Sequence, residues 1–139
     1  MRKNMTKEET QLLIKDLCAR LPYRVKGLHR GQVHIIANMD GGSLYPSIQV
    51  NGYDAWFPIE TFKPYLRPME SMTEKETYIF QQDILNEVEA RCIHSLGSGK
   101  YSLAFTEAND WLNEHHFDYR GLIEKGLALE APEDMYKTE

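Results

Sequence analysis

The 139-residue chain has few cysteines and no long hydrophobic run. Its two cysteines, Cys18 and Cys92, lie far apart and lack the Cys or His neighbours that a zinc site needs. We interpret both as buried thiols, because one pair is not the disulfide framework of a small secreted domain. Apolar runs far shorter than about 20 residues exclude a membrane-spanning helix, and the polar start Met1–Lys7 is unlike a signal peptide. We therefore expect a cytoplasmic protein with no membrane partner.

Recognisable catalytic motifs are also missing. There is no G-x-S-x-G elbow, and neither cysteine has a catalytic sequence context. Gly97-Ser98-Gly99-Lys100 matches part of a phosphate-binding loop, but His94 replaces the first glycine of that motif and Tyr101 replaces its Ser or Thr. We interpret this segment as a flexible linker. The sequence thus predicts no catalytic residue and no cofactor, and an enzyme of a type not visible in the sequence is kept as an alternative.

Length and composition indicate one globular domain over residues 1–139. A chain of this size buries roughly two-thirds of its unfolded surface, which is enough for a core without disulfides or metals. Hydrophobic residues make up 42% and charged residues 27%, as in ordinary globular proteins, so we expect frayed structure only at residues 1–5 and 133–139.

The first half of the chain predicts a helix followed by short strands. Thr6 and Glu9 form a capping-box pattern ahead of leucines at helical spacing, which predicts a helix over Lys7–Arg20. Glycine-containing turns, among them Arg30-Gly31 and Asn51-Gly52, then separate apolar segments. A two-residue turn at Asn51-Gly52 would pair Ile48 with Ala55. The predicted strands are Tyr23–His29, Gln32–Asn38, Leu44–Val50 and Tyr53–Phe57, and Ile59–Pro68 adds a helical turn and a last extended piece.

The second half predicts helices. Thr73 and Glu76 repeat the capping-box pattern, and apolar residues then recur every fourth position, which predicts a helix over Glu74–Ile93. Thr106 is a candidate cap for a third helix, and Asp118 for a short fourth one over Tyr119–Lys125. The predicted fold is therefore α+β. It has an N-terminal helix, an antiparallel meander of four or five strands that is open or closed into a small barrel, and two or three further helices.

Several aromatic and polar residues raise the question of a binding site. The aromatic segment from Trp56 to Leu66 would form a peptide groove if exposed, but we expect it to seal the sheet, because a small domain needs its aromatics in the core. Adjacent histidines on a helix point about 100° apart, and H-E-x-x-H is absent, so we predict no metal site. The residues that remain as metal candidates are His115, His116 and Asp118.

Positive charge is concentrated in one segment, although the net charge is −5. No acidic residue lies between Asp16 and Asp40. Curled sheets bind nucleic acid through charged grooves and stacking aromatics. The candidate nucleic-acid contacts are Arg20, Tyr23, Arg24, Lys26, His29 and Arg30. In the alternative interpretation, Arg20 pairs with an acidic helix residue and the other cations form the solvated face of a strand.

Four blocks of the sequence carry a resemblance. They are Leu21–Gly27, Lys63–Met69, Ser71–Glu74 and Asp118–Pro132, of which the last reads DYRGLIEKGLALEAP. Together they resemble a family of uncharacterised small proteins from gut Bacteroidales bacteria and their phages or prophages, whereas residues 78–105 depart from that pattern. The resemblance implies a bacterial, cytoplasmic protein linked to mobile elements, and it implies no catalytic residue.

The leading hypothesis for function is a non-enzymatic accessory or adaptor domain that binds a macromolecule, with an unknown protein as its partner. Nucleic-acid binding through the basic segment is the first alternative, and an enzyme is the second. The sequence leaves the partner and the oligomeric state open.

Overall fold

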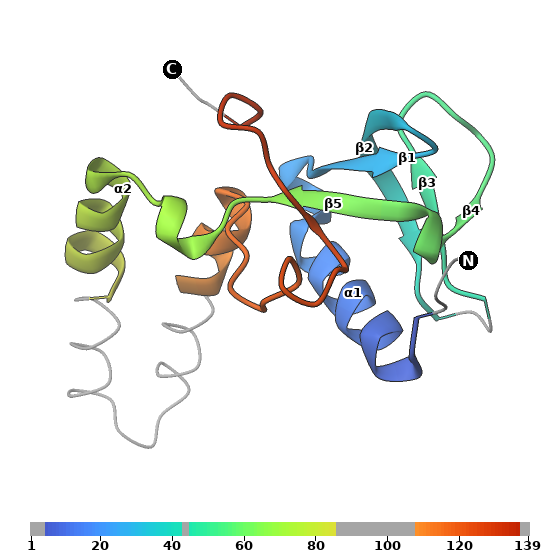
Figure 1. Ribbon diagram of the computed structural model, residues 1–139, viewed down its shortest axis with the longest axis horizontal. Coiled ribbons are helices and arrows are strands. Elements are labelled where there is room, and N and C mark those ends of the chain that lie inside the picture. The colour runs from blue at the N-terminus through green and yellow to red at the C-terminus, as the bar shows by residue number, and fades with distance from the viewer. Residues whose placement is uncertain (1–4, 43–44, 86–107, 137–139) are drawn as a thin grey trace.

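The computed structural model describes residues 5–42, 45–85 and 108–136, and it confirms the α+β class (Figure 1). A mixed six-stranded sheet follows the N-terminal helix, and helical segments come after five of its strands. Residues 108–114 form a helix that begins the last described stretch. The named elements are α1 (Lys7–Arg20), β1 (Lys26–His29), β2 (Gln32–Asp40), β3 (Ser47–Val50), β4 (Phe57–Pro58), β5 (Phe62–Leu66), α2 (Glu74–Ile79), the π-helical turn Phe80–Leu85 and β6 (Leu129–Glu130).

The helix α1 begins and ends where the sequence predicts. The Thr6 hydroxyl accepts a hydrogen bond from the Glu9 N–H, and the Glu9 carboxylate accepts one from the Thr6 N–H, which completes the capping box. Leu13 and Leu17 are buried in the hydrophobic core. Cys18 is exposed, contrary to the prediction, because it lies one position beyond Leu17 and so leaves the buried face.

The sheet has the strand order β4-β3-β2-β1-β5-β6 and is not closed into a barrel. Neighbouring strands are antiparallel except β5 and β6, which run parallel. Arg30 and Gly31 both have positive φ, at 50° and 80°, as the tight turn between β1 and β2 requires. A bulge between Ile36 and Asn38 interrupts β2, which pairs with β1 over its first half and with β3 over its second half.

The pairing predicted after Asn51-Gly52 is wrong by two residues. The Tyr53 N–H does donate to the Val50 carbonyl, but Ile48 lies opposite Phe57, so residues 51–56 form a loop and not a tight hairpin. A type I′ turn needs positive φ at both central positions, and in this turn Gly52, at 92°, is the one residue that has it.

The predictions for the second half are met in part. The capping box of Thr73 and Glu76 starts α2, as predicted. The helix predicted over Tyr119–Lys125 is wrong, because left-handed glycines at 121 and 126 turn the chain, although the Asp118 carboxylate does cap the turn. The rest of the helix predicted to Ile93, Cys92, the linker at 97–100 and the cap at Thr106 lie outside the described residues.

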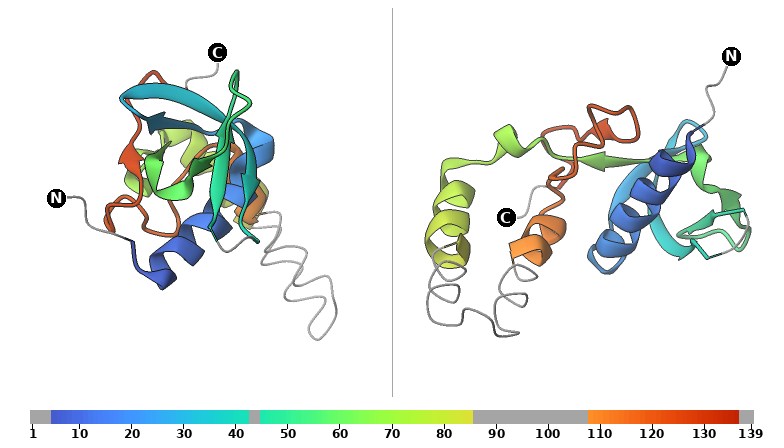
Figure 2. Two further views of the ribbon diagram at one scale, coloured as in Figure 1. Left: turned by 90° about the vertical axis from the view of Figure 1, so that its right-hand side faces the viewer. Right: turned by 90° about the horizontal axis from the view of Figure 1, so that it is seen from below.

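The core lies between α1 and the curled sheet, and α2 stands at the opposite end of the molecule from β3 and β4 (Figures 1 and 2). Phe62 and Leu66 are buried, so this aromatic segment does seal the sheet, whereas Trp56 is half exposed. Within the three described stretches, no helix combines the length and the apolar content needed to span a bilayer.

Candidate functional site

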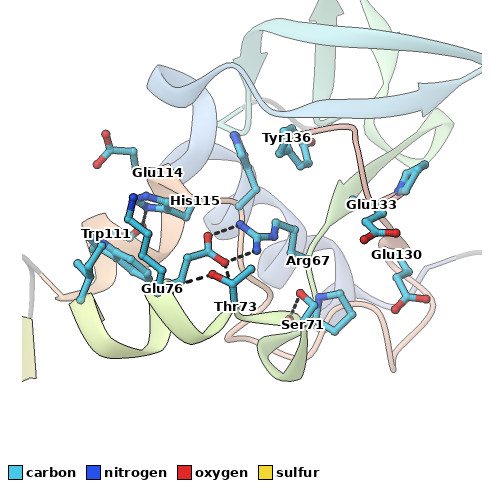
Figure 3. Close-up of a pocket in the computed structure, with 16 residues that line it drawn as sticks. Arg67, Ser71, Thr73, Glu76, Trp111, Glu114, His115, Glu130, Glu133 and Tyr136 are labelled. Carbon is cyan, nitrogen blue, oxygen red and sulfur yellow. Dashed lines mark hydrogen bonds and ion pairs between the residues drawn. The ribbon is translucent and has the colours of Figure 1, made fainter. Parts of the chain in front are cut away.

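A cleft of about 1250 Å³ opens where α2, the helix 108–114 and the C-terminal segment meet (Figure 3). Three stretches far apart in the sequence line it, within 67–79, 111–116 and 130–136. Side chains from all three surround the same space, so the site exists only in the folded chain. We refer to this space as the cleft and to residues 129–136 as the strap.

Arg67 connects the parts of the chain that line the cleft. Its guanidinium makes two hydrogen bonds to the Glu76 carboxylate, at 2.7 and 2.6 Å, and lies 4.2 Å from the centroid of the Phe117 ring. The Arg67 N–H donates to the His116 carbonyl, and the Arg67 carbonyl accepts from the Asp118 N–H. Arg67 therefore holds the end of β5 against both α2 and the segment that follows helix 108–114.

Glu76 is held as an anion at the bottom of the cleft. Its carboxylate also accepts from the Thr73 N–H at 3.0 Å, which completes the capping box of α2. Hydrogen bonds from Arg67 lower the pKa of Glu76 from 4.5 to about 2, although partial burial opposes this shift. The charges of Arg67 and Glu76 thus neutralise each other within the protein.

One wall of the cleft consists of two stacked rings, Trp111 in helix 108–114 and His115 directly after it. The His115 ring stacks on Trp111 with 4.1 Å between centroids, and its Nδ1 lies 2.9 Å from the Trp111 carbonyl oxygen. Because a carbonyl oxygen only accepts, Nδ1 is the donor in this hydrogen bond. Phe80 and Phe117 flank Trp111 at 5.1 and 6.0 Å, so this wall is firmly packed.

His116 ends the helix in a conformation that usually belongs to glycine. Its φ is 64°, and the Phe117 and His116 N–H groups donate to the carbonyls of Leu112 and Asn113, as in a Schellman motif. The residue is 8% exposed, and its Nδ1 has no hydrogen-bond partner among the described residues. Burial, together with nearby cations such as Arg20, lowers the pKa of His116 to about 4, so the ring is neutral at pH 7.

The strap forms the opposite wall. Tyr136 anchors it: the hydroxyl accepts from the Lys26 N–H and donates to the Tyr65 carbonyl, both at 2.8 Å. The Tyr136 ring stacks on His116 with 3.8 Å between centroids. Burial raises the pKa of the hydroxyl above its usual range, so it remains a donor. The fraying predicted from Glu133 onward is therefore not what residues 133–136 show.

Hydrogen-bond acceptors dominate the cleft. Four carboxylates and two cations line it, which leaves two negative charges when histidine is counted as neutral. Besides the neutralised Arg67 and Glu76, the lining has one exposed cation, Lys75, and three exposed carboxylates. No ion pair joins those three carboxylates to any residue that the structure describes. They are Glu114, Glu130 and Glu133.

The predicted nucleic-acid contacts are divided between the core and the surface. Arg20 is fully buried and pairs with Asp16 at 2.9 Å, so it cannot contact a nucleic acid, and the alternative prediction of an acidic helix partner is confirmed. His29 is also buried, 4% exposed, and the Lys26 ammonium donates to the Met135 carbonyl.

The exposed cations of this segment do not form one surface. Arg24 and Arg30 flank β1 at its two ends, and the Arg30 guanidinium lies 4.7 Å from the centroid of the Phe57 ring. Tyr23, which precedes Arg24 in the sequence, is half-buried. Nucleic-acid binding through these residues stays a prediction.

The three metal candidates point to different places. His115 stacks on Trp111, His116 stacks on Tyr136, and the Asp118 carboxylate caps the following turn. Across residues 5–42, 45–85 and 108–136, no three or more His, Cys, Asp or Glu side chains gather as a metal site.

Some parts of the cleft could be predicted from the sequence, but their meeting in one cleft could not. The capping box of Thr73 and Glu76 and the polar end of helix 108–114 were predictable locally. Arg67, Trp111 and Tyr136 were missed as site residues, because their partners lie elsewhere in the chain. One usable signal was Tyr136 itself, an aromatic residue in an otherwise polar tail.

Comparisons of the chain with protein-family models, with curated proteins and with solved structures found no match. The resemblance to the Bacteroidales family therefore stays a prediction. The function of the cleft has to be argued from its own geometry and chemistry.

Proposed function

We propose that this protein is a non-enzymatic adaptor that binds an extended segment of a partner protein in the cleft. The observation that carries this proposal is a cleft of about 1250 Å³ with walls held in place before any ligand binds. Small-molecule pockets typically have volumes of roughly 300–1000 Å³, so the cleft has room for several residues of a peptide.

The construction of the walls supports binding with little rearrangement. The stacked rings of Trp111 and His115 form one side, Tyr136 anchors the other, and the pair of Arg67 and Glu76 braces the bottom. A site that is rigid before binding loses less conformational entropy when the ligand arrives. Apolar surface from Ile79 and Pro132 lies beside exposed acceptors, which suits a chain with both apolar side chains and N–H donors.

A selection from random peptides tests this function. Phage-displayed peptides about twelve residues long would be enriched on the wild-type protein and then titrated as labelled synthetic peptides by fluorescence anisotropy. Lys75→Trp places a large ring in the cleft and should weaken binding about tenfold or more. The matched control is Lys15→Trp, on the exposed surface of α1, which should change the affinity by less than about twofold.

Two results would overturn the proposal. Enriched peptides that bind both variants equally well would locate peptide binding outside the cleft. Failure to enrich any peptide, combined with salt-sensitive binding of labelled single-stranded RNA or DNA, would favour the nucleic-acid alternative. Circular dichroism of each variant would show that the fold is retained.

A further inference from the structure

We infer that the strap is a pH-sensitive latch, in which a proton on His116 breaks the stack with Tyr136 and frees the end of the strap. The inference goes beyond the proposed function, because it concerns one wall of the cleft and not what the cleft binds. It rests on three features of the structure: the bonds that hold the end of the strap, a buried histidine against Tyr136, and the cations around that histidine.

The end of the strap is held through Tyr136 and Met135. The Tyr136 hydroxyl accepts a hydrogen bond from the Lys26 N–H and donates one to the Tyr65 carbonyl, and the Lys26 ammonium donates to the Met135 carbonyl at 3.2 Å. Residues 132–134, which precede this end, are exposed. Release of such a segment costs less free energy than unfolding of the whole protein, because it leaves the core in place.

The His116 ring supplies a further contact to Tyr136. The two rings stack with 3.8 Å between centroids and 18° between planes, so Tyr136 covers one face of the imidazole. The histidine is 8% exposed, and its Nδ1 has no hydrogen-bond partner among the residues that the structure describes. Both nitrogens of a protonated imidazole are donors. A proton on His116 would therefore leave a buried N–H of a charged ring without an acceptor, which is unfavourable while the strap is closed.

The charges around His116 add to this cost. Three cations from different parts of the chain raise the electrostatic potential at its ring, namely Arg20 of α1, Lys26 of β1 and Arg67 at the end of β5. The neighbouring His115 acts in the same direction. Release of the strap would admit water to the ring, and water both screens these charges and accepts the hydrogen bond.

The nearby carboxylates are engaged elsewhere. Asp16 binds Arg20 at 2.9 Å, Glu76 binds Arg67 at 2.6 Å, and the Asp118 carboxylate caps the turn that follows it. No ion pair joins a carboxylate to the His116 ring within the three described stretches. The closed strap therefore favours the neutral histidine, and the open strap accepts the proton.

Hydrogen exchange of single N–H groups, measured by NMR, tests the latch. The Lys26 N–H reports on the end of the strap, because the Tyr136 hydroxyl is its acceptor. The Ile36 N–H, which donates to the Val25 carbonyl at 3.1 Å, reports on the sheet. The pKa of His116 is about 4 with the strap closed, against 6.5 for an exposed histidine, so the open strap binds more protons. The protection of the Lys26 N–H should therefore fall about twentyfold from pH 7 to pH 5.

Two variants assign this effect to one histidine. His116→Asn tolerates the left-handed conformation and does not titrate, so its Lys26 protection should change by less than about twofold between pH 7 and pH 5. The matched control is His115→Gln. It removes the adjacent histidine, which stacks on Trp111 and not on Tyr136, and it should keep a fall of about tenfold or more.

Mild urea separates release of the strap from global unfolding. About 1 M urea should lower the protection of the Ile36 N–H about tenfold and leave that of the Lys26 N–H unchanged, because a local opening exposes little surface. Equal urea dependence at the two groups would mean that the strap opens only with the whole fold and would overturn the inference. Equal Lys26 protection at pH 7 and pH 5, or a fall that persists in His116→Asn, would overturn it too. No peptide enters these measurements, so either result leaves the proposed function to its own test.

Discussion

Two arginine–carboxylate clusters in this molecule share their chemistry but differ in burial. Asp16 binds Arg20 and Arg120, each at 2.9 Å, and the side chains of Asp16 and Arg20 are fully buried. The side chains of Arg67 and Glu76 are 20% and 18% exposed and line the cleft. Asp16 and Arg20 are out of reach of any ligand, and their cluster fixes the C-terminal segment on α1 through Arg120, whereas the second cluster shapes a surface that a partner can reach. An arginine–carboxylate pair is thus structural in one place and part of a candidate site in the other.

Removing the carboxylate from each cluster tests this comparison with the largest expected effect. Asp16→Ala leaves a buried arginine without its partner and should cost about 3–5 kcal/mol of unfolding free energy. Glu76→Ala removes a partly exposed pair and a cap, which should cost about 2 kcal/mol. Urea unfolding followed by tryptophan fluorescence measures both, with Glu60→Ala as the exposed control, expected within about 0.5 kcal/mol of the wild type. Equal costs for Asp16→Ala and Glu76→Ala would break the comparison.

The pH dependence of the unfolding free energy tests the cleft through His116. His116 takes up a proton near pH 6.5 in the unfolded chain but only near pH 4 in the folded protein, because its pKa is lowered to about 4. The unfolded state therefore binds more protons between these values, and the protein should lose about 2–3 kcal/mol as the pH falls from 6.5 to 4. Below about pH 4.5, protonation of Glu76 adds a further loss that continues toward pH 2.

The variant His116→Asn isolates the contribution of His116 to the pH dependence of the unfolding free energy. Asparagine tolerates the left-handed conformation and does not titrate, so the slope between pH 6.5 and 4 should become shallower. Urea unfolding at intervals of pH, for the wild type and for His116→Asn, provides the measurement. An identical slope in both proteins would show that His116 is not held neutral by the fold.

Among these variants, Arg120→Ala should change the unfolding free energy least, and it tests how far burial sets the strength of the Asp16 cluster. Arg120 binds the buried Asp16 but is itself 18% exposed, and it lies 4.6 Å from the centroid of the Tyr119 ring. Arg120→Ala leaves Asp16 its bond to Arg20, so we expect a cost of about 1 kcal/mol in the same urea assay. A loss above about 3 kcal/mol would mean that the number of partners, and not burial, sets the strength of this cluster.

Prediction from the sequence succeeded at the helix caps and at one tight turn, and it failed at the second hairpin. The capping boxes at Thr6 and Thr73 and the turn at Arg30-Gly31 were all predicted, since each depends on residues within a few positions. The pairing of Ile48 with Phe57 was not predicted, because Asn51 does not adopt the positive φ that a two-residue type I′ turn needs, and residues 51–56 form a longer loop.

By itself, the sequence determined α1, the antiparallel meander of β1 to β4 and the start of α2, because caps, turns and apolar spacing act over short distances. The fifth strand does not continue the meander, because β5 pairs with β1. Only the tertiary structure decided that Arg120 binds Asp16, and that Tyr136 binds Lys26 from the far end of the chain. Those contacts require the whole fold to bring together residues more than a hundred positions apart. The cleft is of the same kind, since each of its walls comes from a different part of the sequence.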